Sequence, residues 1–127
     1  MMRILISVAF SSLLLLSACS GLNKMGKSTS TGIKEVEEKV VPVDPGVSAR
    51  YNYFVIIGSF RDPVNAREYQ EEISSKGFTP AILRNEAGLY RVSVLSTNQI
   101  EAARSEIRRI REAFPEHADT WLLIQKN

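Results

Sequence analysis

The chain has 127 residues, which allows one small domain with flanking segments and excludes a multidomain enzyme. Sixteen Lys and Arg residues nearly balance fourteen Asp and Glu residues, and a net charge of +2 is too weak to indicate a nucleic-acid partner. One Cys and one His exclude an internal disulfide framework and a metal-chelating or Cys–His–Asp cluster, so no catalytic residue, metal or cofactor is expected.

Residues 1–18 are predicted to form an export signal. Arg3 precedes an apolar run from Ile4 to Leu16, which is shorter than the roughly 20 residues of a transmembrane span. The run Leu16-Ser17-Ala18-Cys19 resembles the lipobox of bacterial lipoproteins, which implies a lipid anchor on Cys19. Ser20 then implies sorting to the outer membrane, facing the periplasm, as in many Gram-negative bacteria. A simple secretory signal with an incidental cysteine is the alternative.

Residues 19–50 are predicted to be the lipidated cysteine and a flexible tether. The first part is small and polar, and Pro42 and Pro45 favour extended backbone. A helical turn within residues 35–41 would end at Pro42. Residues 20–50 span at most roughly 100 Å when stretched, so the tether would let the domain work far from its membrane. A spacer without any length requirement is the alternative.

Residues 51–127 repeat one plan after a shift of thirty-seven positions, which aligns Tyr53 with Tyr90 and Val55 with Val92. Each half reads as a strand, an amphipathic helix and a strand. Asp62-Pro63 and Gly77 are typical of the two ends of a helix, and Asn98 with Glu101 resembles a capping box. The pattern predicts strands at 52–59, 78–84, 89–95 and 120–125, and helices at 63–76 and 99–113.

Two such halves, joined by a hairpin turn at residues 85–88, predict an α+β fold of order βαββαβ, with both helices on one face of a four-stranded antiparallel sheet. Strand alternation directs Val55, Ile57 and Val92 toward the helices. The other face would be open, and an apolar patch with a Trp on an open face indicates a binding surface. Its expected residues are Phe54, Ile56, Leu83, Arg91, Ser93 and Trp121. With the strand parity reversed, Trp121 would belong to the core instead.

Several short segments in this order resemble a SPOR domain over residues 51–127. They are Tyr53 to Phe60, Ala66, Gly77-Phe78, Gly88 to Val92, and Trp121. The resemblance implies a ferredoxin-like fold whose exposed sheet face binds peptidoglycan glycan strands without stem peptides, often at division sites. Aromatic rings can stack on pyranose rings, while Arg and Ser can bond sugar hydroxyl and acetamido groups.

The expected glycan-binding residues are Ile56, Ser59, Tyr90, Arg91, Ser93 and Trp121. Tyr90 alternates onto the core side and would reach only the rim, and Ser59 is equally interpretable as an ordinary strand end. The chain departs from the family pattern twice: Ile56 stands where Gln is common, and Leu95-Ser96-Thr97 replaces Gly-Pro-Phe. Because Ile56 has no polar side chain, the face lacks the hydrogen bonds that a Gln at this position would make with glycan.

Three other classes of function compete with this interpretation. An enzyme is disfavoured because His117 is expected in a solvated turn, and the Glu residues lie on helix surfaces. A basic run on the second helix could bind an anionic polymer, but it is expected to be a solvated helix face balanced by glutamates. Its residues are Arg104, Arg108, Arg109 and Arg111. An RNA-binding module is disfavoured by charge and by the export signal. The main alternative is an envelope lipoprotein whose open face or edge strand docks a division or envelope protein.

Overall fold

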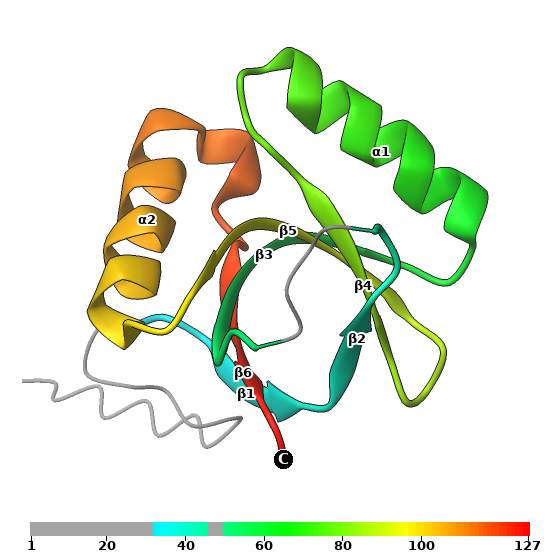
Figure 1. Ribbon diagram of the computed structural model, residues 1–127. Helices are drawn as coiled ribbons and strands as arrows, with labels where there is room; N and C mark the ends of the chain where they lie inside the picture. Colours follow the sequence, from blue (N-terminus) through cyan, green and yellow to red (C-terminus); the bar gives the residue numbers. More distant parts are fainter. Residues whose placement is uncertain (1–31, 46–49) are drawn as a thin grey trace, which may run out of the picture.

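The computed structural model describes residues 32–45 and 50–127, which form one sheet with two helices against it (Figure 1). The predicted export signal and Cys19 lie outside these residues. The elements in chain order are β1 (Glu35–Glu38), β2 (Val40–Pro42), β3 (Tyr53–Phe60), α1 (Pro63–Ser75), β4 (Ala81–Asn85), β5 (Tyr90–Thr97), α2 (Ile100–Ala113), the short 3-10 helix η1 (Pro115–His117) and β6 (Trp121–Gln125).

The ends of α1 follow from local chemistry, as expected. The Asp62 carboxylate accepts a hydrogen bond from the Val64 backbone N–H at 2.7 Å, and Pro63 takes the first turn. Gly77 adopts a φ of 96°, which stops the helix without steric cost. The expected capping box of α2 is wrong, because the Asn98 side chain instead accepts from the Asn52 backbone N–H at 3.0 Å, and Gln99 has no side-chain cap.

The sheet has six strands in the order β1-β6-β3-β5-β4-β2. Its four central strands are the predicted ones, and each pairs antiparallel with its neighbour. The prediction of a four-stranded antiparallel sheet is therefore incomplete. Two further strands extend it, and β1 makes the sheet mixed because it runs parallel to β6, whereas β2 runs antiparallel to β4.

Both helices lie on the same face of the sheet, as the βαββαβ order predicted (Figure 1). The core between them and the sheet contains Val55 and Ile57 from β3 together with Ala66 and Ile73 from α1. Ala103, Ile107 and Ile110 supply the apolar stripe of α2. The predicted strand parity is confirmed, because Phe54 and Ile56 belong to a second cluster on the opposite face.

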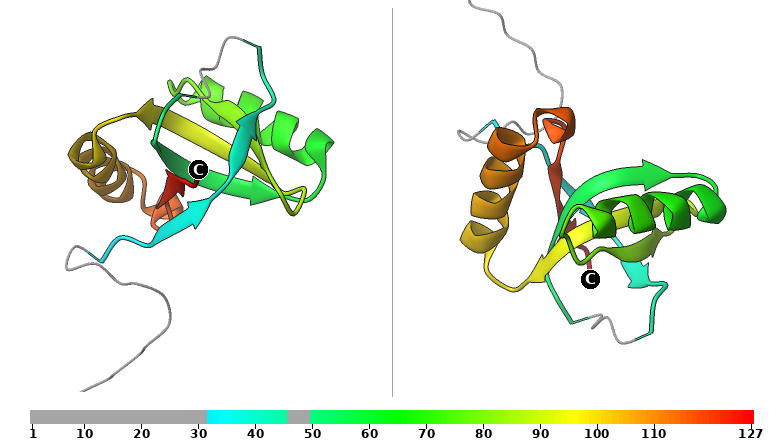
Figure 2. Two further views of the ribbon diagram at one scale, coloured as in Figure 1. Left: turned by 60° about the horizontal axis from the view of Figure 1, so that its bottom comes forward. Right: turned by 90° about the horizontal axis from the view of Figure 1, so that it is seen from above.

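Residues 33–44, which we call the strap, cross this opposite face from one edge of the four central strands to the other (Figure 2). The strap begins beside β6 through β1 and ends beside β4 through β2, with only Lys39 between the two strands. The prediction that residues 19–50 form a flexible tether is wrong for the strap. Pro42 does not end a helical turn here, because it lies in an extended strand whose partner is Leu83.

Candidate functional site

The sheet face that the sequence predicted to be open is covered by the strap. The Val40 side chain is 2% exposed and packs in a cluster with five side chains of the central strands. These are Phe54, Ile56, Leu83, Trp121 and Leu123. The expectation of an open face is therefore wrong. Its physical cause is that the face is too apolar to stay in water, and the chain's own preceding segment removes it from solvent.

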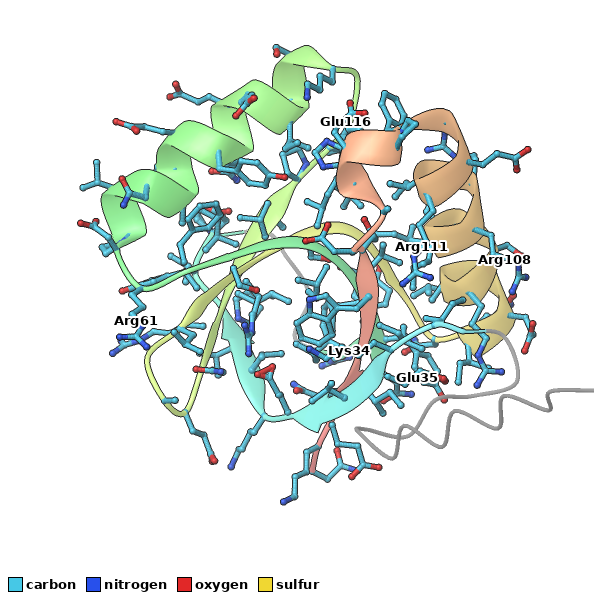
Figure 3. The ribbon with its side chains drawn as sticks, turned by 180° about the vertical axis from the view of Figure 1, so that it is seen from behind. Lys34, Glu35, Arg61, Arg108, Arg111 and Glu116 are labelled. Atoms are coloured by element: carbon cyan, nitrogen blue, oxygen red, sulfur yellow. The ribbon has the colours of Figure 1, made fainter. Side chains whose placement is uncertain are left out.

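The aromatic platform of this face, Trp121, is only 9% exposed. Two cations lie near its ring, the Lys34 ammonium of the strap and the Arg91 guanidinium of β5, each 5.1 Å from the ring centroid. Figure 3 shows Lys34, near the start of the strap, lying over the sheet. The surface on which a ligand ring would stack is therefore already in contact with charged side chains.

Arg91 is paired to a carboxylate of the strap. Its Nη2 donates to Glu38 Oε1 at 2.5 Å, and its Nε donates to both Glu38 oxygens at 3.2 Å. The two side chains are 16% and 13% exposed, so the pair is largely removed from water. The Asn85 side-chain amide also donates to Glu38 Oε1, at 2.9 Å. A guanidinium that binds both oxygens of a carboxylate is a specific anion receptor.

Two further acidic residues hold the ends of the strap. Glu35 accepts from Arg104 of α2 at 2.6 Å and is 7% exposed. At the other end Asp44 accepts from Arg67 of α1, from the Gln70 side chain at 3.0 Å and from the Ile82 backbone N–H at 3.1 Å. Burial raises the pKa of Asp44, but these hydrogen bonds and the Arg67 charge outweigh it and hold the pKa below the ordinary 3.8.

Hydrogen bonds between side chains and backbone groups complete the attachment of the strap. The Gln125 side chain donates to the Val40 carbonyl and accepts from the Val40 N–H, each at 2.9 Å. Arg111 of α2 donates to the carbonyls of Thr120 and Gly32. The expected solvated arginine face of α2 is thus wrong for Arg104 and Arg111, which reach the strap or its start, and Arg108 points outward (Figure 3).

The six residues predicted for glycan binding are not brought together on one accessible surface. Ile56, Ser93 and Trp121 lie beneath the strap, with exposed fractions of 0%, 2% and 9%. The Ser93 hydroxyl donates to the Leu95 carbonyl at 3.0 Å. Arg91 is engaged by Glu38, and Tyr90 packs against the helix-side core, as its alternation suggested. Ser59 is exposed at the end of β3, opposite Arg91.

Sequence reasoning missed Lys34, Glu38 and Val40 as members of this site. Alternation within residues 36–40 placed Val36, Glu38 and Val40 on one side of an extended segment, which was a usable signal.

A prediction also failed at His117, which is 7% exposed rather than solvated. Its Nδ1 lies 3.5 Å from the Tyr69 hydroxyl, and its ring centroid lies 6.2 Å from that of Phe114.

Within residues 32–45 and 50–127, no group of three His, Cys, Asp or Glu side chains is placed to hold a metal ion. No helix in this described part of the chain is both long enough and apolar enough to span a bilayer.

The connectivity of the central unit, strand–helix–strand twice over with both helices on one face, defines a small α+β domain of βαββαβ type. The family model of the SPOR domain matches residues 49–118, more than half of the chain, and the protein belongs to the SPOR domain family. SPOR domains are generally peptidoglycan-binding domains of the cell envelope rather than enzymes, and they are associated with cell division. The strap and β6 lie outside the matched residues.

Neither the curated proteins nor the solved structures with which the chain was compared contain a match.

Proposed function

We propose that this protein is a lipid-anchored peptidoglycan-binding protein that recognises glycan strands without stem peptides at or near the division site. The observation that carries the proposal is the match of the SPOR family model over residues 49–118. The sheet face beneath the strap supports it, since Trp121 and Arg91 lie 5.1 Å apart there, measured from ring centroid to guanidinium carbon. That pair joins a stacking surface to an anion receptor, which are the two groups that an anionic saccharide needs.

The lipid anchor is proposed from the sequence Leu16-Ser17-Ala18-Cys19. Lipid chains on Cys19 would hold the domain at a membrane, by our proposal the periplasmic face of the outer membrane. Mass spectrometry of the protein from bacterial membranes should find an acylated Cys19 at the new amino terminus. A Cys19→Ser variant should move from the membrane fraction to the soluble fraction, and an unmodified Cys19 in the wild type would refute this part.

Docking of a protein partner on a sheet edge is the weaker candidate. The two outer strands of the βαββαβ unit, β6 and β4, already pair with β1 and β2 of the strap. The edges of the four central strands are thus occupied by the chain itself, and β1 and β2 are the edge strands of the six-stranded sheet.

The test is retention on purified cell-wall sacculi. A chain that starts at Ser20 keeps every described residue and omits the proposed signal and lipid site. It should be retained more strongly on sacculi whose stem peptides an amidase has removed than on intact sacculi. Equal retention on both would refute the preference for bare glycan, and no retention on either wall, by this chain or by a variant whose strap is loosened, would refute peptidoglycan binding by this protein.

A further inference from the structure

The strap makes on the sheet face the contacts that a carboxylated saccharide would make. Its carboxylate Glu38 occupies Arg91, its cation Lys34 lies near the Trp121 ring, and its apolar side chain Val40 fills the space above Ile56. Because Arg91 and Glu38 are both largely buried, a ligand that replaced the strap would have to bring its own carboxylate. An unpaired guanidinium left in that place would be strongly unfavourable.

The charge of the strap is consistent with an anion held by this domain. Residues 32–45 contain four carboxylates and two lysines. Three of those carboxylates, Glu35, Glu38 and Asp44, each pair with an arginine from a different element of the domain. The arginines are Arg104 from α2, Arg91 from β5 and Arg67 from α1.

The chemistry of bare glycan supplies the same group. When an amidase cuts the amide bond between the lactyl ether of a muramic acid residue and its peptide, water adds across that bond. The peptide leaves with the new amine, and the lactyl group keeps a free carboxylate. Intact strands carry an amide at that position, which cannot form the ion pair that Arg91 makes with Glu38.

We therefore propose that the strap is an internal competitor for the glycan site. A carboxylated glycan strand displaces the strap, and Arg91 exchanges the Glu38 carboxylate for the lactyl carboxylate of the sugar. This inference rests on the proposed function, since it assumes that the ligand is bare glycan. In addition to the proposed function, the glycan site then has a resting state in which the strap occupies it, a step in which the strap is displaced, and Arg91 as the receptor for the carboxylate of the sugar.

The first test locks the strap in place. Val41 and Arg84 are opposite each other on β2 and β4, both are exposed, and facing residues of antiparallel strands lie within the distance that a disulfide spans. The chain from Ser20 has no other cysteine. With Val41→Cys and Arg84→Cys, the oxidised protein should lose retention on amidase-treated sacculi, and reduction of the same sample should restore it.

The second test loosens the strap at the ion pair. Glu38→Gln keeps the shape of the side chain and removes its charge, so retention on amidase-treated sacculi should rise by roughly ten-fold, the scale of one hydrogen bond to a charged group. Glu37→Gln, which removes an exposed carboxylate of the same strand, is the matched control and should leave retention unchanged. Circular dichroism confirms that each variant is folded.

The third test removes the charge of the ligand. Amidase-treated sacculi whose carboxylates are capped as methylamides should bind the reduced and Glu38→Gln proteins about ten-fold more weakly than uncapped sacculi. Equal binding to capped and uncapped walls would overturn the role of Arg91 as receptor. Equal binding by the oxidised and reduced proteins would overturn displacement while leaving the proposed function intact. Failure of every form, Glu38→Gln included, to bind any wall would overturn the proposed function itself.

Discussion

Gly58 shows how one residue decides the packing of the family's Gly-Ser-Phe segment. Its φ is not positive, so it does not serve a turn. Instead, the edge of the Tyr69 ring lies where a side chain would begin, since a Cβ on Gly58 would meet Tyr69 Cε1 at 2.5 Å. The Tyr69 hydroxyl donates to the Ile57 carbonyl at 3.2 Å, which keeps the ring there.

We expect Gly58→Ala to destabilise the domain by about 1–3 kcal/mol, the usual cost of overpacking a filled site. The neighbouring Ser59→Ala is the control, because Ser59 is exposed and its change should cost little. Urea unfolding followed by circular dichroism measures both. A Gly58→Ala protein as stable as the wild type would mean that Tyr69 moves aside freely.

Asp44 makes the attachment of the strap dependent on pH. Its pKa is lowered in the folded protein, so the stability that it contributes is fully present above the unfolded value of about 3.9 and is lost as pH falls through the lower folded value. The melting temperature, measured from about pH 5 downward, should therefore fall more steeply for the wild type than for Asp44→Asn. The exposed Glu37→Gln should follow the wild-type curve. Parallel curves for all three proteins would exclude this role for Asp44.

At the level of elements, the sequence predicted the structure wherever apolar residues recurred with a regular period inside one helix or strand. Alternation on β3 separated Phe54 and Ile56 from Val55 and Ile57, and the structure has them in two different clusters. The spacing of Ile107 and Ile110 likewise identified the buried stripe of α2. These patterns can be interpreted because the position of a residue along a helix or strand decides on which face of that element its side chain lies.

The strap could not be predicted in the same way. Its strands have only four and three residues, and its contacts come from distant parts of the chain: Glu35 pairs with Arg104, 69 positions away, and Val40 with Gln125, 85 positions away. Short extended segments gain their stability from such partners, not from propensity. The composition that suggested a flexible tether was therefore compatible with a strand.

The strap is expected to depend strongly on the apolar side chain at its centre, Val40. Val40 is buried in the cluster of Phe54 and Trp121, whereas its neighbour Val41 is 55% exposed. Val40→Asp should weaken strap attachment by about 2–3 kcal/mol because it removes the burial of Val40 and places a charge on an apolar face. Val41→Asp is the matched control. Faster protease cleavage within residues 32–50 and a red shift of Trp121 emission should appear in the Val40 variant alone.

For the whole molecule, the folded unit is larger than the family match. The domain predicted at 51–127 contains both helices and the four central strands, yet it lacks the segment that covers Trp121 and Leu123. A chain that starts at Arg50 should thus expose a contiguous apolar patch. Compared with a chain that starts at Gly32, it should unfold at a lower temperature and self-associate in sedimentation experiments. Equal melting temperatures and two monomers would show that the strap contributes nothing to the fold.

If Cys19 carries the lipid anchor of the proposed function, the strap would also set how far the domain can stand from that anchor. With residues 33–44 in the sheet, the covalent path from Cys19 to the sheet covers fourteen positions, to Ile33, and would reach at most roughly 45 Å if fully stretched. With the strap displaced, the path extends to Arg50, thirty-one positions and at most roughly 100 Å. Ligand binding would then more than double the radius available to a tethered domain. A protein that has found one glycan strand could thus follow it across a gap that its resting state cannot span.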